Sequence, residues 1–270
     1  MTPTINRLLV VGLGLIGGSL AKAARERGLC REVIGSSRNP DTLSKALASG
    51  VVDRVIIDIG DVAGDLGEGD VVLVGVPTLT VPDIMHQLQP LLADSVTVTD
   101  VASVKGSVVT AVRRAYGKMP AQFVPGHPIA GSEKSGVDAA NSGLFDDHRV
   151  ILTPLQETGK EHLQRVRGLW QGAGAVISEM TVAEHDEVLA ATSHLPHILA
   201  YTLVDTLAGM RENREIFRYA AGGFRDFTRI AASDPMMWHD IVMANDQALL
   251  AVLETFTDHV DQLKDAIQNK

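Results

Sequence analysis

The sequence predicts an α/β chain with a doubly wound, mostly parallel sheet, followed by an all-helical domain. The first reason is an apolar run at 8–11 that leads directly into a glycine-rich loop and a helix-forming segment. The second is that short apolar runs alternate with helical stretches up to about residue 180, which is typical of a parallel sheet. The third is that only helical periodicity remains beyond Thr181. We therefore expect one domain at 1–180 and a second at 181–270.

The glycine-rich loop at 12–17 reads GLGLIG. A strand, G-x-G-x-x-G and a helix in this order form the dinucleotide-binding fingerprint of a Rossmann domain. Gly12 permits the tight turn, Gly14 lets a pyrophosphate approach the backbone, and Gly17 lets the helix pack closely on the strand. The pyrophosphate is expected on the free backbone amides at the positive end of the helix. The cofactor-binding residues expected in this loop are Gly12, Gly14, Leu15, Ile16 and Gly17.

The next predicted strand, at 32–35, ends in Ser36, Ser37 and Arg38, about 20 residues beyond the glycines. Enzymes that use NAD usually have an acidic residue here, which hydrogen-bonds the ribose hydroxyls. Two hydroxyls and an arginine suit a 2′-phosphate better, so we expect these three residues to contact the cofactor and to favour NADP over NAD. The alternative is that Arg38 is a solvated loop residue and that both cofactors are accepted. A helix is expected next, with Asn39 as its N-cap and Pro40 at its first position.

Strands and helices are expected to alternate through the rest of the first domain. The strands are predicted at 55–57, 70–77, 95–100, 122–124, 149–154 and 175–178, with helices at 81–92 and 160–171. Sites in such sheets lie at the carboxyl ends of the strands. Pro77, Ser103 and His127 each follow a predicted strand, so we expect them, with Val76, to meet around the cofactor.

His127 is the candidate base. It lies in a predicted loop that Pro125 and Pro128 stiffen, and histidine titrates near the working pH of most enzymes. The alternative is a loop histidine that makes only a structural hydrogen bond.

One long helix, kinked at Pro196, is predicted over 184–207. At 100° per residue, His185, Ser193 and His197 fall within a sector of about 120° on this otherwise apolar helix. Polar groups in such a place must be hydrogen-bonded or face a cavity, so we expect them to form the polar wall of a pocket. His194 and His197, three residues apart, could suggest a metal, but no set of carboxylates or cysteines at ligand spacing accompanies them, so no metal site is expected.

Shorter helices are expected near 213–220 and 224–232, and a final helix at 235–267. Arg229, on the second of these, is expected to bind either Asp226 or an anionic ligand. The final helix carries an apolar stripe, which packs either within its own domain or against a second copy of the chain. The stripe consists of Phe256, Val260, Leu263 and Ile267.

Composition excludes several classes of partner. Of the 270 residues, 45% are hydrophobic and 21% are charged, and the net charge is −9. Such a charge indicates neither nucleic acid nor an anionic membrane as partner. The single cysteine, Cys30, rules out an internal disulfide framework. Neither a secretory signal nor a membrane-spanning run is predicted, so we expect a cytoplasmic protein.

Six motifs cover nearly the whole chain. They are VVGLGLIGGSL at 10–20, DVASVKG at 100–106, PGHPIAGSEKSGV at 125–137, EHD at 184–186, TSHLPH at 192–197 and GFRDFTRIAASDPMMW at 223–238. In kind and in order they resemble the motifs of the prephenate dehydrogenase family of tyrosine biosynthesis, which is also described as arogenate or cyclohexadienyl dehydrogenase.

The resemblance implies oxidative decarboxylation of prephenate to 4-hydroxyphenylpyruvate, or of arogenate to tyrosine, with hydride transfer to NAD or NADP. It implies that His127 accepts the proton of the substrate's C4 hydroxyl and that Ser103 helps to align His127, the hydroxyl and the nicotinamide. Family members typically form dimers through the helical domain, and many are inhibited by tyrosine. The substrate-binding residues implied are Arg229, which would hold a carboxylate, and His197, Ser193, His185, Glu133, Asp226 and Trp238.

The sequence departs from the family in two respects. The segment at 36–38 lacks the acidic residue of NAD-specific members. We expect no fused chorismate mutase and no C-terminal regulatory domain, so any control by tyrosine is expected to act through the two predicted domains. Prephenate and arogenate are not distinguished, although two histidines and no clearly placed carboxylate favour the keto acid or the use of both.

Two other functions compete with this interpretation. An enzyme of the β-hydroxyacid dehydrogenase or imine reductase type usually carries a lysine on the interdomain helix, and the helix predicted at 184–207 has none. A non-catalytic redox sensor would bind the dinucleotide but would not need Ser103, His127 and Arg229 together.

Overall fold

A computed structural model describes residues 5–131, 134–211 and 213–269. The chain divides into two compact units, Met1–His185 and Asp186–Lys270. The predicted doubly wound α/β fold with a following helical domain is confirmed. The exact boundary at 180/181 stays a prediction. No helix in the described part of the chain is long and apolar enough to cross a membrane.

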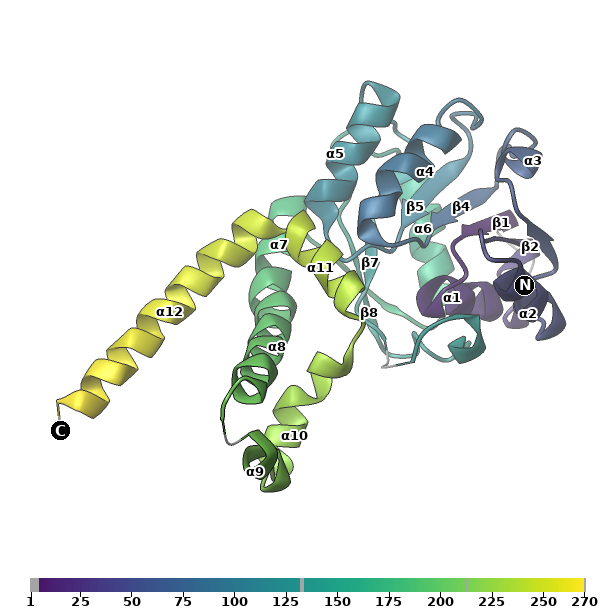
Figure 1. The fold of residues 1–270 in the computed structure, drawn as a ribbon. Coiled ribbons are helices and arrows are strands. Elements are labelled where there is room, and N and C mark those ends of the chain that lie inside the picture. Colours follow the sequence, from purple (N-terminus) through teal and green to yellow (C-terminus); the bar gives the residue numbers. More distant parts are fainter. Residues whose placement is uncertain (1–4, 132–133, 212, 270) are drawn as a thin grey trace. The chain divides into compact units, whose positions relative to one another are not determined.

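The first unit is built on a six-stranded parallel sheet (Figure 1). Its strands are β1 (Ile5–Val11), β2 (Cys30–Ser36), β3 (Arg54–Ile56), β4 (Val71–Val74), β5 (Thr97–Asp100) and β6 (Phe123–Val124). They lie in the order β3-β2-β1-β4-β5-β6, so the direction of winding reverses between β1 and β4. In doubly wound sheets, ligands bind beyond the carboxyl ends of the strands at this reversal.

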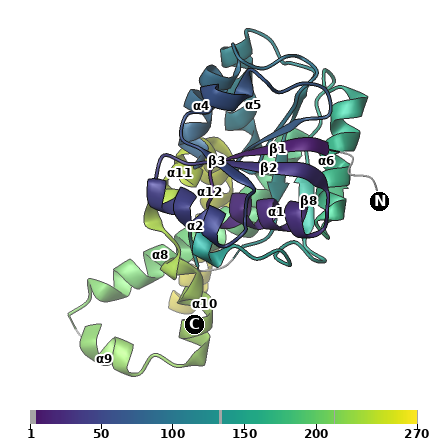
Figure 2. The ribbon, with the colours of Figure 1, turned by 90° about the vertical axis from the view of Figure 1, so that its right-hand side faces the viewer.

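Helices cover both faces of the sheet. They are α1 (Leu15–Glu26), α2 (Pro40–Ala48), α3 (Gly60–Ala63), α4 (Val81–Leu88), α5 (Lys105–Tyr116) and α6 (Lys160–Gly172). Apolar side chains of α1, α2 and α6 pack on one face, and those of α3, α4 and α5 pack on the other. In both views α4 and α5 lie on the opposite side of the sheet from α1 and α2 (Figure 1, Figure 2). The central strands are therefore apolar and almost fully buried.

The start of α2 agrees with the sequence prediction. The Asn39 side chain accepts a hydrogen bond from the backbone N–H of Asp41 at 2.9 Å, as an N-cap does. Pro40 occupies the first helical position, where its missing N–H has no intrahelical partner to lose.

A second, three-stranded sheet carries His127. It consists of β7 (Gly126–Pro128), β8 (Arg149–Leu152) and β9 (Val176–Glu179), with β7 antiparallel and β9 parallel to β8. The prediction that His127 lies in a loop is wrong, because His127 pairs with Ile151 in this sheet. The flanking prolines are compatible with a strand here because β7 is an edge strand, one side of which needs no ladder hydrogen bonds.

The helix predicted over 184–207 is interrupted by a π-helical turn. It consists of α7 (Val182–Leu189), the π-turn at Ala190–His194 and α8 (Leu195–Ala208). The prediction of one helix kinked at Pro196 is wrong, because the interruption precedes this residue. Pro196 lies in the first turn of α8, where proline is tolerated. A π-turn changes the angular step between residues, so the sector of about 120° calculated for a regular helix does not apply across it.

The rest of the second unit is helical. It comprises α9 (Asn213–Arg218), α10 (Gly222–Thr228), a 3-10 turn at Arg229–Ala232, α11 (Pro235–Ala244) and α12 (Asp246–Gln268). The prediction of a single final helix is wrong, because the chain leaves helical geometry at Asn245 between α11 and α12. The buried Asn245 side chain donates to the carbonyl of Asp186 at 2.9 Å and lies 3.1 Å from Nδ1 of His194. These contacts hold the break in place.

Candidate active site

The predicted dinucleotide loop connects β1 to α1. Gly12 has a φ of +102°, and a Cβ there would lie 2.4 Å from the carbonyl oxygen of Gly75. A Cβ on Gly17 would lie 2.2 Å from the carbonyl oxygen of Gly12. Both distances are shorter than any real contact of a Cβ atom. The fold itself therefore requires glycine at 12 and 17, because α1 approaches β1 and the end of β4 this closely.

Gly14 is different. Its φ of −79° suits any residue, and a Cβ on it would meet nothing within 4 Å. It is the N-cap of α1, whose first turn contains no acidic residue. An open position before backbone amides at a helix N-terminus fits the pyrophosphate of a dinucleotide. The described residues of this loop therefore fit the predicted cofactor.

The end of β2 lies beside this loop. The carbonyl of Ser36 accepts a hydrogen bond from the backbone N–H of Gly12 at 2.9 Å. The hydroxyl of Ser37 accepts one from the backbone N–H of Asn39 at 3.2 Å. Arg38 is exposed, and its guanidinium forms no ion pair with any residue that the structure describes. An exposed, uncompensated guanidinium at this position suits a phosphate group.

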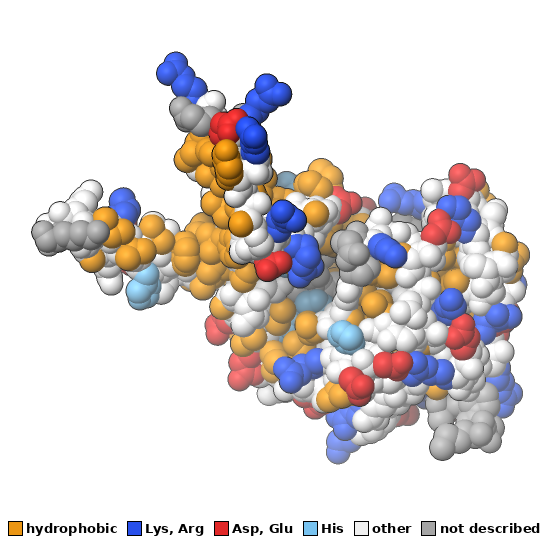
Figure 3. Space-filling view, turned by 90° about the horizontal axis from the view of Figure 1, so that it is seen from below, with side chains coloured by type: hydrophobic (Ala, Val, Ile, Leu, Met, Phe, Trp, Pro, Cys, Tyr) orange, Lys and Arg blue, Asp and Glu red, His pale blue; other side chains and the backbone are white. Residues whose placement is uncertain are grey.

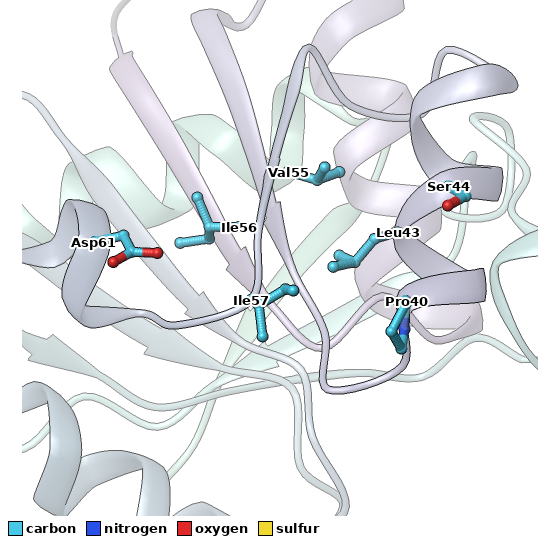
Figure 4. Close-up of a pocket in the computed structure, with 7 residues that line it drawn as sticks. All are labelled: Pro40, Leu43, Ser44, Val55, Ile56, Ile57 and Asp61. Atoms are coloured by element: carbon cyan, nitrogen blue, oxygen red, sulfur yellow. The ribbon is translucent and has the colours of Figure 1, made fainter.

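A shallow pocket of about 430 Å³ lies between α2 and the end of β3 (Figure 4). Pro40, Leu43 and Ser44 lie on one side of it and Ile56, Ile57 and Asp61 on the other. None of the predicted site residues lines this pocket, and most of its lining is apolar.

His127 and His185 form a buried pair in the first unit. Nδ1 of His127 lies 2.9 Å from Nε2 of His185, and the two rings meet edge to face at a centroid distance of 5.1 Å. His185 is fully buried and His127 is 9% exposed. His185 was predicted to bind substrate, but its Nε2 contacts the candidate base. The sequence gives no indication of this contact, because the two residues are 58 positions apart.

Ser103 lies in the turn between β5 and α5, and two charged residues at its ends are fully buried. Asp100 is the last residue of β5 and Lys105 is the first of α5. Nζ of Lys105 contacts the Asp100 carboxylate and also donates to the carbonyl of Gly126 at 2.6 Å. Sequence reasoning missed both residues, although a lysine and an aspartate beside a buried strand are rare enough to be noticed.

In the second unit, His197 stacks on Trp238. Their ring centroids are 3.7 Å apart and the planes differ by 20°. Nδ1 of His197 lies 2.9 Å from the carbonyl oxygen of Ser193, so it carries a proton and donates it. Burial lowers the pKa of His197, the hydrogen bond to Ser193 raises it, and the positive charge of Arg229 lowers it. Ser193, His197 and Trp238, which were all predicted to bind substrate, therefore lie together, and the charge of Arg229 acts on His197.

The remaining residues predicted to bind substrate are either exposed or lie outside the described residues. Arg229 begins the 3-10 turn and is exposed, as is Asp226 on α10. Among the described residues Arg229 forms no ion pair with Asp226, so the internal carboxylate expected as one alternative does not hold it. The hydroxyl of Tyr201 donates to the carbonyl of Ser233 at 2.6 Å and thereby fixes the end of this turn to α8. Glu133 lies outside the described residues.

Comparisons with known proteins agree with this geometry. Residues 20–179 match the family model described as the prephenate dehydrogenase nucleotide-binding domain, and residues 181–270 match that of the prephenate dehydrogenase dimerization domain. The cyclohexadienyl dehydrogenase of Zymomonas mobilis is 38% identical over 270 residues, which cover 98% of this chain and 89% of that protein.

Solved structures are similar over almost the entire chain. The prephenate dehydrogenase of A. aeolicus, in complex with hydroxyphenyl propionate and NAD+, is 39% identical with a TM-score of 0.91, over 98% of this chain and 91% of that one. The arogenate dehydrogenase of Synechocystis is 32% identical with a TM-score of 0.81, over 97% and 92% of the two chains.

Proposed function

This chain belongs to the prephenate dehydrogenase family, and we propose that it oxidises and decarboxylates prephenate, arogenate or both in tyrosine biosynthesis. The observation that carries the proposal is the buried pair of His127, on the strand directly after β6, and His185, on α7. Among the residues that the structure describes, no feature favours the β-hydroxyacid dehydrogenase or sensor functions over this one. The family models support the proposal that the nucleotide-binding and helical domains meet at 180/181.

The reaction needs one base and correct orientation. A bound nicotinamide ring supplies the acceptor for the hydride that leaves C4 of the substrate. As C4 is oxidised, His127 takes the proton of its hydroxyl. The ring carboxylate departs as CO2, and the electrons of the broken C–C bond complete an aromatic ring whose oxygen is a phenolate. The proton then returns from His127 to this oxygen, which gives the phenol of the product. Aromatisation makes this step strongly favourable, so the protein contributes mainly proton transfer and alignment.

We propose that Nε2 of His127 is the base, because its Nδ1 contacts His185. If Nε2 is the base, the neutral ring must carry its proton on Nδ1. Nδ1 then donates to Nε2 of His185, 2.9 Å away. We propose that His185 fixes the orientation and tautomer of His127 in this way, and that Ser103 hydrogen-bonds close to the same hydroxyl of the substrate.

The second unit offers groups for the substrate's carboxylate and side chain. We propose that Arg229 binds a carboxylate and that His197, Ser193 and Trp238 surround the side chain. Support comes from the stack of His197 on Trp238 and from the charge of Arg229 nearby. Glu133 and Asp226 remain proposed contributors to substrate orientation.

Initial rates at 340 nm with prephenate and with arogenate, each with NAD and with NADP, test the proposal. Turnover in at least one of the four combinations is expected. Absence of turnover from folded protein in all four would contradict the proposed function and favour a sensor. The ratios of kcat/KM would identify the preferred substrate.

We propose that the cofactor is NADP rather than NAD, on the strength of Ser36, Ser37 and the exposed Arg38. We expect Arg38→Asp to reverse the preference, because a carboxylate repels the 2′-phosphate and accepts hydrogen bonds from ribose hydroxyls. A hydrogen bond to a charged group contributes about 1.5–3 kcal/mol. The ratio of kcat/KM with NADP to kcat/KM with NAD should therefore fall by about tenfold or more.

Arg31→Asp is the matched control for this substitution, because it changes the charge by the same amount. Arg31 is also exposed, but it lies at the amino end of β2, whereas Arg38 follows the carboxyl end. It should leave the cofactor preference unchanged. A wild-type preference for NAD would show that our interpretation of 36–38 is wrong.

We further propose a homodimer formed through the helical domain. The stripe predicted on α12 is exposed in the single chain: Phe256 and Val260 are 38% exposed, Leu263 is 60% and Ile267 is 56% exposed. Hydrophobic side chains gather along this helix in the space-filling view (Figure 3). Packing within its own domain therefore does not account for the stripe, whereas the match to a dimerization domain supports a second copy as its partner.

Leu263→Glu should convert the dimer to a monomer, because it buries a charge in an apolar interface. Light scattering after size-exclusion chromatography measures the mass. Gln262→Glu, which adds the same charge to the neighbouring exposed position, should leave the dimer intact. An unchanged mass for Leu263→Glu would exclude this stripe as the interface.

Two smaller proposals complete the function. We propose that the enzyme is cytoplasmic, because the soluble dinucleotide that it reduces is reoxidised there. We also propose that tyrosine, which is the product formed from arogenate and resembles the one formed from prephenate, competes with the substrate for the His197–Trp238 region. Inhibition that rises as the substrate concentration falls would support this competition.

A further inference from the structure

Asp100 and Lys105 are the only fully buried ion pair of oppositely charged side chains in the described part of the chain. They stand at the two ends of the turn that carries Ser103, at the carboxyl end of β5. Burying two charges is costly and rarely adds stability over an apolar pair of the same size. A pair in this position therefore needs an explanation in terms of what it holds.

The pair holds the strand that carries His127. Oδ1 of Asp100 accepts a hydrogen bond from the backbone N–H of Gly126 at 3.2 Å. Nζ of Lys105 donates to the carbonyl of Gly126 at 2.6 Å. That carbonyl belongs to the peptide bond that joins Gly126 to His127. Both polar backbone groups of the residue before the candidate base are therefore bound by the pair.

The pair also holds the turn that carries Ser103. Oδ2 of Asp100 accepts a hydrogen bond from the backbone N–H of Ala102 at 2.9 Å, and it contacts Nζ of Lys105. The same carboxylate thus binds the residue before Ser103 with one oxygen and the residue before His127 with the other. Space is tight here as well, since a Cβ on Gly126 would lie 3.2 Å from the carbonyl oxygen of Asp100.

We propose that Asp100 and Lys105 are positioning residues, whose buried pair sets the placement of His127 relative to Ser103. The importance of this placement for turnover rests on the proposed function. The pair acts through the backbone and does not itself contact the substrate. A shift of about 1 Å in a reacting group can reduce a rate about 10²-fold.

The first test is Lys105→Met, which keeps the length of the side chain and removes its charge. We expect kcat to fall about 10²-fold, with little change in KM or in the dissociation constant of the cofactor. The pH profile of kcat should also change, since His127 loses its orientation toward His185. Because Lys105→Met leaves Asp100 buried without its partner, the double variant Asp100→Asn/Lys105→Met is measured beside it and should show the same loss.

Arg7→Met is the matched control for general destabilisation. Arg7 forms an ion pair with the buried Asp70 at the opposite, amino-terminal edge of the same sheet, with an Nη2–Oδ2 distance of 2.6 Å. Its loss should lower the melting temperature but leave kcat and its pH profile unchanged. The contrast separates placement of the base from stability of the sheet.

A second measurement does not require turnover. The Cε1–H signals of His127 and His185 in NMR spectra, assigned with His127→Ala and His185→Ala, should move in both pair variants and stay in place in Arg7→Met. Folded pair variants with wild-type kcat, pH profile and histidine signals would overturn the inference. If the wild type turned over neither substrate, the proposed function would fail, and the histidine signals alone would decide whether the pair positions His127.

Discussion

His127→Ala should reduce kcat by about 10²–10⁴-fold, because general acid–base catalysis contributes about that much and no other described group takes its place. The variant should still bind the cofactor with wild-type affinity, since His127 is expected to act on the substrate's hydroxyl. KM should change little for the same reason. Steady-state rates at 340 nm and a cofactor titration by fluorescence measure these quantities.

His86→Ala serves as the matched control, because His86 is exposed on α4 and has no proposed role. It should behave as the wild type does. The kcat of His185→Ala should lie between those of His127→Ala and His86→Ala, since this variant keeps the base but removes the group that accepts the hydrogen bond from its Nδ1–H. A His127→Ala variant with wild-type kcat would exclude His127 as the base, and turnover by the wild type would by itself exclude a purely non-catalytic sensor.

Much of the fold could be predicted because its signals are local. Glycines at fixed spacing after an apolar run identify β1 and α1, and the Asn39–Pro40 pair marks the start of α2. Strands that are buried on both faces read as continuous apolar runs, so most of the parallel sheet was visible in the sequence. Each of these features depends on residues that are close together in the sequence.

The errors arise where distant residues decide the local structure. His127 lies in a strand because β7 pairs with β8, and a three-residue segment between prolines carries no strand signal of its own. The break at Asn245 depends on hydrogen bonds to Asp186 and His194, which are more than fifty positions away. Apolar periodicity continues on both sides of the break, so it predicted a single helix.

The candidate site shows the same division. Its residue types could be predicted, because a base, an arginine and a dinucleotide loop are recognisable one at a time. Their partners could not, since His185 meets His127 and Lys105 meets Gly126 only through the fold. The π-turn had no sequence signal either, yet it contains Ser193 and lies between His185 on α7 and His197 on α8, so the predicted sector does not apply.

The glycines of the dinucleotide loop give the second large effect, because the structure assigns them different tasks. Gly14→Ala should weaken cofactor binding about 10–100-fold, since its methyl group occupies the space that the pyrophosphate needs and disturbs hydrogen bonds worth about 1.5–3 kcal/mol. The cofactor-free variant should be as stable as the wild type. Its φ of −79° suits alanine and no atom lies within 4 Å of the new Cβ, so the smaller entropy of the unfolded chain offsets a poorer N-cap.

Gly17→Ala should instead reduce the stability of the cofactor-free protein. Its Cβ would lie 2.2 Å from the carbonyl of Gly12, so α1 must move away from β1 and the protein should lose about 1–3 kcal/mol of stability even without cofactor. Thermal unfolding with and without NADP, combined with titration of the cofactor, distinguishes the two variants. The protein alone gives no steric reason for glycine at position 14, so a bound pyrophosphate is the proposed reason. If Gly14→Ala bound the cofactor with wild-type affinity, the pyrophosphate would therefore lie elsewhere.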